Sequence, residues 1–192
     1  HCNQTALFES VIKYKATLKT DNPVATMQEA FYHATEGRPG PVLLNFPTDM
    51  GKAACLDSSS IQISKKNSSP DSSSINAVRD IIKASRRPVI IAGQDILRGG
   101  ATAELLEFIE NIEAAVLVNL DARGVVPEAH PRWAGVLQGF FSPNIIETEV
   151  LSNADMICLV GADAIMSNKP IITDLPVCEI SAHPEYEITS CN

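Results

Sequence analysis

The sequence lacks any segment that would place it in a membrane or on a nucleic acid. None of its apolar runs reaches the roughly eighteen residues that a membrane-spanning helix needs, and it does not begin with a charged-then-apolar signal segment. Basic residues are in the minority, because 15 Lys and Arg stand against 23 Asp and Glu and leave a formal net charge of −8. Since affinity for phosphate backbones and anionic lipids comes from clustered Lys and Arg, we expect no nucleic acid and no membrane as a partner.

Cysteine and histidine are too few and too scattered to indicate a disulfide framework or a metal site. The five cysteines show no CxxC spacing and are odd in number, and the four histidines lack metal-ligand spacing. The cysteines are Cys2, Cys55, Cys158, Cys178 and Cys191. We therefore expect reduced thiols, a cytoplasmic location and no metal ligands. Cys158 lies in a continuous apolar run, which is typical of a small core residue and not of a nucleophile.

Self-contained catalytic motifs are also absent. The sequence holds no GxSxG, HExxH or GxGxxG pattern, and its single Gly-Lys pair, Gly51 and Lys52, lacks P-loop spacing. With 10 Gly and 12 Pro the chain is not fibrous or disordered, and 45% apolar residues are enough for a core. The pattern indicates a globular chain without an assignable catalytic residue.

The first fifty residues predict a strand, a helix and a second strand. Apolar residues alternate with lysines and threonine over residues 12–19, which is typical of a half-exposed strand. Asn22 and Pro23 then predict a helix start, and Gly37 predicts its end. Residues 41–47 predict a buried strand between prolines. Because one helix covers only one face of a sheet, we expect part of this domain to be missing from the front.

A serine-rich stretch follows, in which nine of the eighteen residues 57–74 are Ser. It offers too little apolar surface to offset the entropy lost on ordering, so it predicts a linker, with a surface loop of a single domain as the alternative. We expect the cluster of serines at residues 72–74 to cap the helix that begins next.

Beyond the linker, helical patterns alternate with fully apolar strand patterns. Strands are predicted at residues 88–93, 114–120, 154–161 and 176–180, helices at 75–82, 105–112 and 145–151, and an irregular stretch at 121–142. This alternation predicts an α/β fold, a doubly wound parallel sheet with helices on both faces in a Rossmann-like domain.

The candidate binding residues lie where these strands end, because ligands of open parallel sheets gather beyond the carboxyl ends of the strands. They are Gly93, Gln94, Asn119, Gly161 and Ala162. Glycine allows a nucleotide to approach the backbone, but it equally allows the tight turn of any strand-to-helix connection. Asp95 and Asp163 weigh against a nucleotide, because a carboxylate repels a pyrophosphate unless a cation intervenes.

Several stretches resemble the thiamine diphosphate enzymes of the acetolactate synthase and 2-oxo acid decarboxylase superfamily. GRPGPVLLNFPTD at residues 37–49 is similar to the final strand of their pyrimidine-binding domain, and residues 12–14 and 30–34 resemble its TKW strand and AF..A helix. RPVIIAG at 87–93 resembles the opening strand of their central domain. GVVPEAHP at 124–131 is similar to its GxxPExHP loop, and residues 153–161 to its ADxxLxxG strand.

The resemblance implies a map of the chain. Residues 1–50 correspond to the end of a pyrimidine-binding domain, residues 51–73 to a linker and residues 74–192 to the central domain. The family's catalytic glutamate lies earlier, and the GDG motif that holds magnesium and diphosphate lies in a third domain. We therefore expect a fragment that is not catalytic by itself, whose partners are the missing domains of the parent enzyme and, as in the family, further copies of the chain.

Some family members bind FAD or an adenine nucleotide in the central domain, and this sequence departs from their pattern. Gln94 and Asp95 follow Gly93, Asp163 stands where an arginine is expected, and residues 180–183 replace an acidic pair. The resemblance thus implies thiamine diphosphate and Mg²⁺ in the parent enzyme, and it favours a structural central domain over FAD binding. A stand-alone adenine-nucleotide module binding FAD, ADP or NAD, and a ligand-free oligomerisation unit, are the alternatives.

Overall fold

The computed structural model describes residues 3–52, 54, 69–137, 146–162 and 174–182. The chain forms two compact units, His1–Ser68 and Ser69–Asn192. The expected linker at residues 51–73 lies largely outside the described residues, and each unit is described here by itself.

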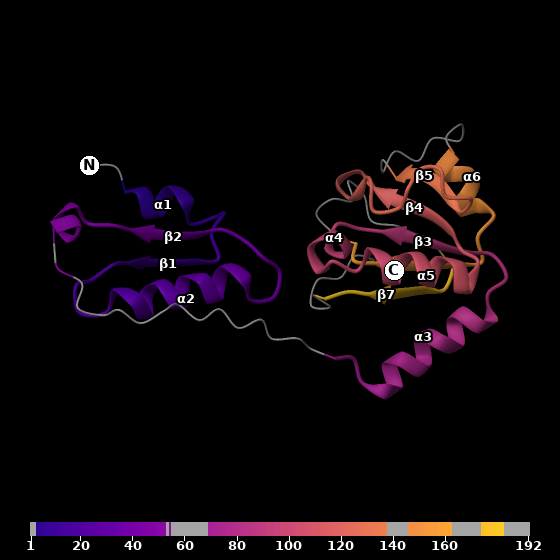
Figure 1. The fold of residues 1–192 in the computed structure, drawn as a ribbon, viewed down its shortest axis with the longest axis horizontal. Helices are drawn as coiled ribbons and strands as arrows, with labels where there is room; N and C mark the ends of the chain where they lie inside the picture. Colours follow the sequence, from indigo (N-terminus) through magenta and orange to yellow (C-terminus); the bar gives the residue numbers. More distant parts are fainter. Residues whose placement is uncertain (1–2, 53, 55–68, 138–145, 163–173, 183–192) are drawn as a thin grey trace. The chain divides into compact units, whose positions relative to one another are not determined.

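The first unit is a small parallel sheet with one long helix packed on it (Figure 1). Its elements in chain order are α1 (Gln4–Phe8), β1 (Tyr14–Thr17), α2 (Pro23–Thr35), β2 (Val42–Asn45) and the 3₁₀ helix η1 (Thr48–Lys52). Strands β1 and β2 run parallel, with Tyr14 opposite Val42. The predicted order of strand, helix and strand is confirmed.

Local details of this unit follow the sequence pattern. In β1 half-buried Tyr14 and Ala16 alternate with exposed Lys15 and Thr17. Helix α2 has Pro23 at its first position and is followed by Gly37 in the left-handed conformation, at φ 56°. Both terminal signals act as predicted, because Pro needs no N–H partner there and Gly has no Cβ to clash.

The prediction of a buried strand at residues 41–47 was wrong in its degree of burial. All four residues of β2 are only half-buried, and the side chain of Phe46 just after it is 62% exposed. The physical reason is that β2 has one partner strand in the described residues, so the rest of its apolar surface is not covered by the elements seen here.

The second unit contains a five-stranded parallel sheet (Figure 1). Its elements are α3 (Ser72–Ala84), β3 (Pro88–Ala92), α4 (Asp95–Gly99), α5 (Thr102–Ile112), β4 (Ala115–Asn119), η2 (Leu120–Ala122), β5 (Trp133–Leu137), α6 (Ile146–Ser152), β6 (Met156–Val160) and β7 (Val177–Ile180). The strand order is β5-β4-β3-β6-β7. Strands β4 and β5 add on one side of β3, and β6 and β7 add on the other, so the order reverses between β3 and β6.

Each face of this sheet carries its own apolar cluster. On one face Ile90 and Cys158 pack with Leu105 and Ile109 of α5. On the other face Ile91, Leu117 and Leu159 pack with Val150 and Leu151 of α6. Because helices cover both faces, every residue of β3 is buried, and the predicted doubly wound α/β fold is confirmed.

Two details of this unit differ from the prediction. The stretch at residues 121–142, expected to be irregular, contains β5, which ends the sheet. Its Gly135, at φ 132°, and a shift of register in β4 beside it mask the strand pattern. Helix α3 begins at Ser72, so its N-cap is Asp71, whose carboxylate accepts the Ser74 N–H at 2.9 Å, and the serines form its first turn.

Candidate functional site at the carboxyl edge of the sheet

The ends of β3 and β6 meet at the point where the strand order reverses, and they meet through backbone. A Cβ atom placed on Gly93 would lie 2.2 Å from the carbonyl oxygen of Gly161 and 2.3 Å from the Cα of Ala162. No side chain fits there. The structure therefore brings together three of the five predicted binding residues, and it assigns Gly93 to close packing of two chain segments.

The backbone N–H groups around this contact already have partners. Gly93 donates to the carbonyl of Val160 at 2.8 Å, Asp95 to that of Gly161 at 3.1 Å, and Gly161 to that of Ile180 at 2.8 Å. A phosphate bound at a strand-to-helix turn needs such N–H groups free and pointing at it. All three N–H groups are therefore already used to hold the ends of β3, β6 and β7 in register.

An acidic side chain, that of Asp95, lies at the start of α4, the first helix after β3. Gln94 is the half-buried N-cap of α4 and makes no side-chain capping bond, and Asp95 follows it. The Asp95 carboxylate accepts a hydrogen bond from the Arg98 guanidinium at 2.8 Å. This ion pair occupies the side-chain surface of the short helix and places a carboxylate close to the position that a pyrophosphate would need.

The end of β4 contributes Asn119 and, two residues later, Asp121. Asn119 is 4% exposed and pairs with Leu137 of β5 in the strand register. Both carboxylate oxygens of Asp121 are shielded from solvent and have no hydrogen-bond partner among the residues that the structure describes. The sequence pattern singled out Asn119 but offered no signal for the burial of the Asp121 carboxylate, because burial depends on how the neighbouring strands pack.

The loop GVVPEAHP holds α5 and β5 together. The Nε2 of His130 lies 3.1 Å from a carboxylate oxygen of Glu110 on α5, and its Nδ1 accepts the Arg132 N–H at 3.2 Å. Val125 and Val126 of the same loop are fully buried. His130, Val125 and Val126 of this motif therefore have structural contacts inside the domain.

In the first unit the side chains of Lys13 and Tyr14 contact α2 and the residues just beyond its end. The Lys13 ammonium donates to the carbonyls of Glu36 and Arg38, at 2.5 and 2.8 Å, just beyond the helix. The Tyr14 ring stacks on the ring of His33, with centroids 4.4 Å apart, and its hydroxyl donates to Glu29 at 3.0 Å. These contacts fix α2 on β1.

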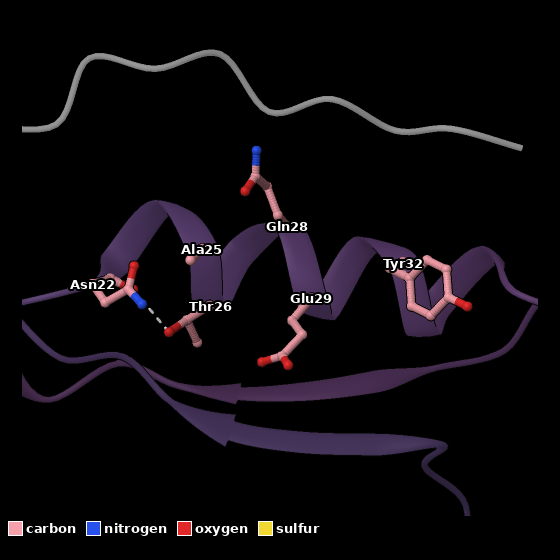
Figure 2. Close-up of a pocket in the computed structure, with 6 residues that line it drawn as sticks. All are labelled: Asn22, Ala25, Thr26, Gln28, Glu29 and Tyr32. Carbon is pink, nitrogen blue, oxygen red and sulfur yellow. Dashed lines mark hydrogen bonds between the residues drawn. The ribbon is translucent and has the colours of Figure 1, made fainter.

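An open depression of about 500 Å³ lies on α2, and none of the five predicted binding residues lines it. Figure 2 shows the residues that line it, all from one helix or its N-cap: Asn22, Ala25, Thr26, Gln28, Glu29 and Tyr32. Two of its polar groups already have partners, because Thr26 donates to the Asn22 carbonyl at 2.9 Å and Glu29 accepts from Tyr14. Glu29 is the only ionisable carboxylate among the residues that line the depression.

Metal-binding and membrane-spanning features were sought over the described ranges. Within them, no three His, Cys, Asp or Glu side chains lie close enough to hold a metal ion together. The helices of the same ranges are also too short or too polar for any of them to cross a bilayer.

Comparison with known proteins identifies the family. The model of the family described as "Thiamine pyrophosphate enzyme, central domain" matches residues 75–176. Acetolactate synthase of Mycobacterium bovis is 30% identical over 145 residues, covering 73% of this chain and 23% of that protein. The large subunit of Escherichia coli acetolactate synthase isozyme 1 is 33% identical over 140 residues, covering 71% and 24%. The 2-hydroxyacyl-CoA lyase 1 of Dictyostelium discoideum is 27% identical, covering 71% and 23%.

Solved structures agree with this result. A thiamin diphosphate-dependent enzyme from Mycobacterium smegmatis matches with a TM-score of 0.77 and 26% identity, over 95% of this chain and 36% of that one. Benzoylformate decarboxylase from Polynucleobacter necessarius matches with a TM-score of 0.73 and 25% identity, over 91% and 34%. The chain spans about a quarter of the length of the curated relatives it matches. The resemblance expected from the sequence is confirmed: the chain belongs to the thiamine pyrophosphate enzymes and contains their central domain.

Proposed function

We propose that the chain is the middle section of a thiamine diphosphate-dependent 2-oxo acid decarboxylase or carboligase, in which it has a structural role and is not catalytic by itself. The observation that carries the structural role is the backbone contact of Gly93 with Gly161 and Ala162. It occupies the place where an open α/β sheet would bind a nucleotide. Two further observations at the same edge support the structural role. The backbone N–H groups there already have partners, and Asp95 forms an ion pair with Arg98.

The first unit supports the idea of a section of a larger protein. Its apolar side chains Leu7, Val11 and Phe46 are 65%, 61% and 62% exposed. Large apolar side chains that are so exposed in a small unit are consistent with a surface that another segment covers. The remaining domains of the parent enzyme, which by resemblance carry the glutamate and the GDG motif, are the partners that we propose.

An activity assay tests the proposal directly. The purified 192-residue chain, supplied with pyruvate, thiamine diphosphate and Mg²⁺, should release no CO₂ above the rate of a sample without protein, while a complete acetolactate synthase assayed in parallel should turn over. By resemblance, the glutamate that activates the cofactor and the GDG motif that anchors it belong to other domains of the parent enzyme. Decarboxylation by the purified chain would overturn the proposal.

A second measurement separates the structural role from the parent's identity. The flanking regions of the gene should encode a glutamate motif upstream and a GDG motif downstream, and their presence with a nucleotide-free central section would support both parts. A gene that ends where this chain ends would refute the proposal that the chain is part of a larger enzyme. The structural role of the domain would then be tested by the nucleotide-binding experiment described below.

A nucleotide-binding module is the second candidate, and Asp121 is the observation that favours it. In dinucleotide-binding domains an acidic residue accepts hydrogen bonds from a ribose hydroxyl. This residue follows the strand that neighbours the first strand of the sheet. Asp121 follows β4, which neighbours β3, and both of its carboxylate oxygens are buried without a partner. A ribose diol is a chemically suitable donor for such a group.

Thermal unfolding with added nucleotide decides between the candidates. Under the structural proposal FAD, ADP and NAD at millimolar concentration leave the melting temperature unchanged, because a ligand that binds only the folded state would raise it. Under the second candidate one of them raises the melting temperature, and Asp121→Asn removes the increase. An increase that survives Asp121→Asn would contradict the role of Asp121.

A further inference from the structure

Two of the five cysteines, far apart in the sequence, face each other across neighbouring strands. In the register of β6 with β7, Cys158 lies directly opposite Cys178. Side chains at paired positions of parallel strands point to the same face, and both residues belong to the same apolar cluster beneath α5. Both thiols are free, and the residues are 0% and 4% exposed.

The spacing of paired strands suits a bond between these sulfurs. Neighbouring strands run about 4.7–4.9 Å apart, which lies within the Cα separation of about 4.4–6.8 Å that disulfides span, with Cβ atoms about 3.5–4.5 Å apart. The strand register and the shared apolar cluster place the two side chains next to each other. Little displacement of either strand is therefore needed to bring Sγ to Sγ.

The two thiols differ in how readily they ionise. The hydrogen bond with Cys178, together with burial, raises the pKa of Cys158. The same hydrogen bond lowers the pKa of Cys178, because the Cys158 thiol can donate to its thiolate. Cys178 is also the residue on β7, which has a neighbour on one side only in the described sheet. Terminal strands of a sheet open locally more readily than central ones, and such opening gives small reagents access.

We propose that Cys158 and Cys178 form a redox-active dithiol, which a low-molecular-weight disulfide such as glutathione disulfide converts to an intrachain cross-strand disulfide. The Cys178 thiolate attacks one sulfur of glutathione disulfide, forms a mixed disulfide and expels one glutathione thiolate. The Cys158 thiol then loses its proton and attacks the Cys178 sulfur, and the second glutathione leaves as a thiol. Two protein thiols are oxidised and one glutathione disulfide is reduced to two glutathiones.

The disulfide would fasten β7 to β6 covalently. At present backbone hydrogen bonds hold the two strands, among them Gly161 N–H to the Ile180 carbonyl at 2.8 Å and Ile157 N–H to the Pro176 carbonyl at 3.0 Å. With the strands cross-linked, opening of β7 no longer separates these groups. Hydrogen exchange at the Gly161 and Ile157 amides should slow on oxidation, while that of Val116 N–H, which is bonded to Arg132 on the other side of the sheet, should be unchanged.

The test uses the full chain with Cys2, Cys55 and Cys191 replaced by serine, so that only the pair remains. After incubation with glutathione disulfide under native conditions and labelling with N-ethylmaleimide in denaturant, we expect the label to fall from two per chain to none. Without label, the intact mass of the oxidised chain should be 2 Da below that of the reduced chain. Proteolysis of the oxidised chain should yield a peptide in which Cys158 is linked to Cys178. Retention of both labels, or a chain that carries glutathione without the link, would overturn the proposal.

Single variants test the order of attack. In the same background Cys158→Ser should accumulate the mixed disulfide at Cys178, while Cys178→Ser should gain glutathione at least tenfold more slowly. Cys158→Ala and Cys178→Ala provide the same comparison if a buried hydroxyl impairs folding. Equal rates of glutathione addition to both variants, or oxidation only under conditions that unfold the chain, would refute a native-state dithiol.

Discussion

Asp155 and Arg87 exchange hydrogen bonds across 68 residues of sequence. The Arg87 N–H donates to the Asp155 carboxylate at 3.0 Å, and the Asp155 N–H donates to the Arg87 carbonyl at 3.2 Å. The same carboxylate accepts the Arg86 N–H at 2.8 Å and the hydroxyl of Ser85. A residue just before β6 thus satisfies the backbone of the turn that joins α3 to β3. In this chain the aspartate of the stretch that resembles the ADxxLxxG pattern is therefore a structural residue.

Asp155→Ala should destabilise the second unit by about 1–3 kcal/mol, because it leaves the N–H groups of two turn residues without their charged acceptor. Denaturant unfolding followed by the fluorescence of Trp133, the only tryptophan, measures the loss in this unit. Glu107→Ala, which removes an exposed carboxylate on α5, is the matched control and should change the free energy of unfolding little. Equal effects of the two variants would contradict the structural role of Asp155.

The contribution of Asp155 should depend on pH in a defined direction. The hydrogen bond from Ser85, followed by that from the Arg86 backbone, lowers the pKa of Asp155 below its ordinary value. A carboxylate with a lowered pKa adds stability that is fully present above its unfolded pKa, near 3.9, and is lost as the pH falls through the folded pKa. The difference in unfolding free energy between the natural chain and Asp155→Asn should therefore be constant from pH 5 to 7 and shrink below pH 4. A difference that grows on acidification would refute this sign.

Gly93→Ala should cost about 3 kcal/mol, because its Cβ would overlap backbone atoms that no rotamer change can move away. Gly99→Ala is the matched control: its Cβ would meet nothing within 4 Å, and it lies in helix α4, where alanine is favoured by up to about 1 kcal/mol. The midpoints of denaturant unfolding report both changes. Should Gly93→Ala prove as stable as Gly99→Ala, the close contact of β3 with β6 would be disproved.

Glu179→Gln should stabilise the second unit at neutral pH. Burial raises the pKa of Glu179 on β7, although a hydrogen bond with Ser181 opposes the change, and one of its carboxylate oxygens is shielded without a partner. A carboxyl group whose folded pKa is raised contributes most below its unfolded pKa, near 4.3, and loses that contribution as the pH rises through the folded pKa. The neutral amide has no such loss.

The measurement compares melting temperatures of the natural chain and Glu179→Gln between pH 4 and pH 7. The advantage of the variant should be absent at pH 4 and largest at pH 7. The exposed Glu128 provides the control, because Glu128→Gln removes the same charge from a solvated loop. An advantage for Glu179→Gln that is independent of pH would argue against burial of an ionisable group as its cause.

Local pattern was enough to predict most elements of this protein. The alternation at residues 12–19, the Pro and Gly at the ends of α2 and the apolar runs of β3, β4, β6 and β7 act over a few neighbouring residues, so they can be recognised without the fold. The family motifs were visible for the same reason. The strand β5 was not predicted, because Gly135 and the Gly and Pro residues around the strand are typical of a loop.

Residues whose roles depend on partners distant in the sequence could be interpreted only in the folded chain. The sequence by itself determined the α/β class, the acidic surface and the absence of a recognisable catalytic motif. Tertiary structure decided that Gly93 packs against Ala162, that Asp155 holds the turn at Arg87 and that Cys158 faces Cys178. The physical reason is that strand order and register determine these contacts, and register is a property of paired strands and not of either strand alone.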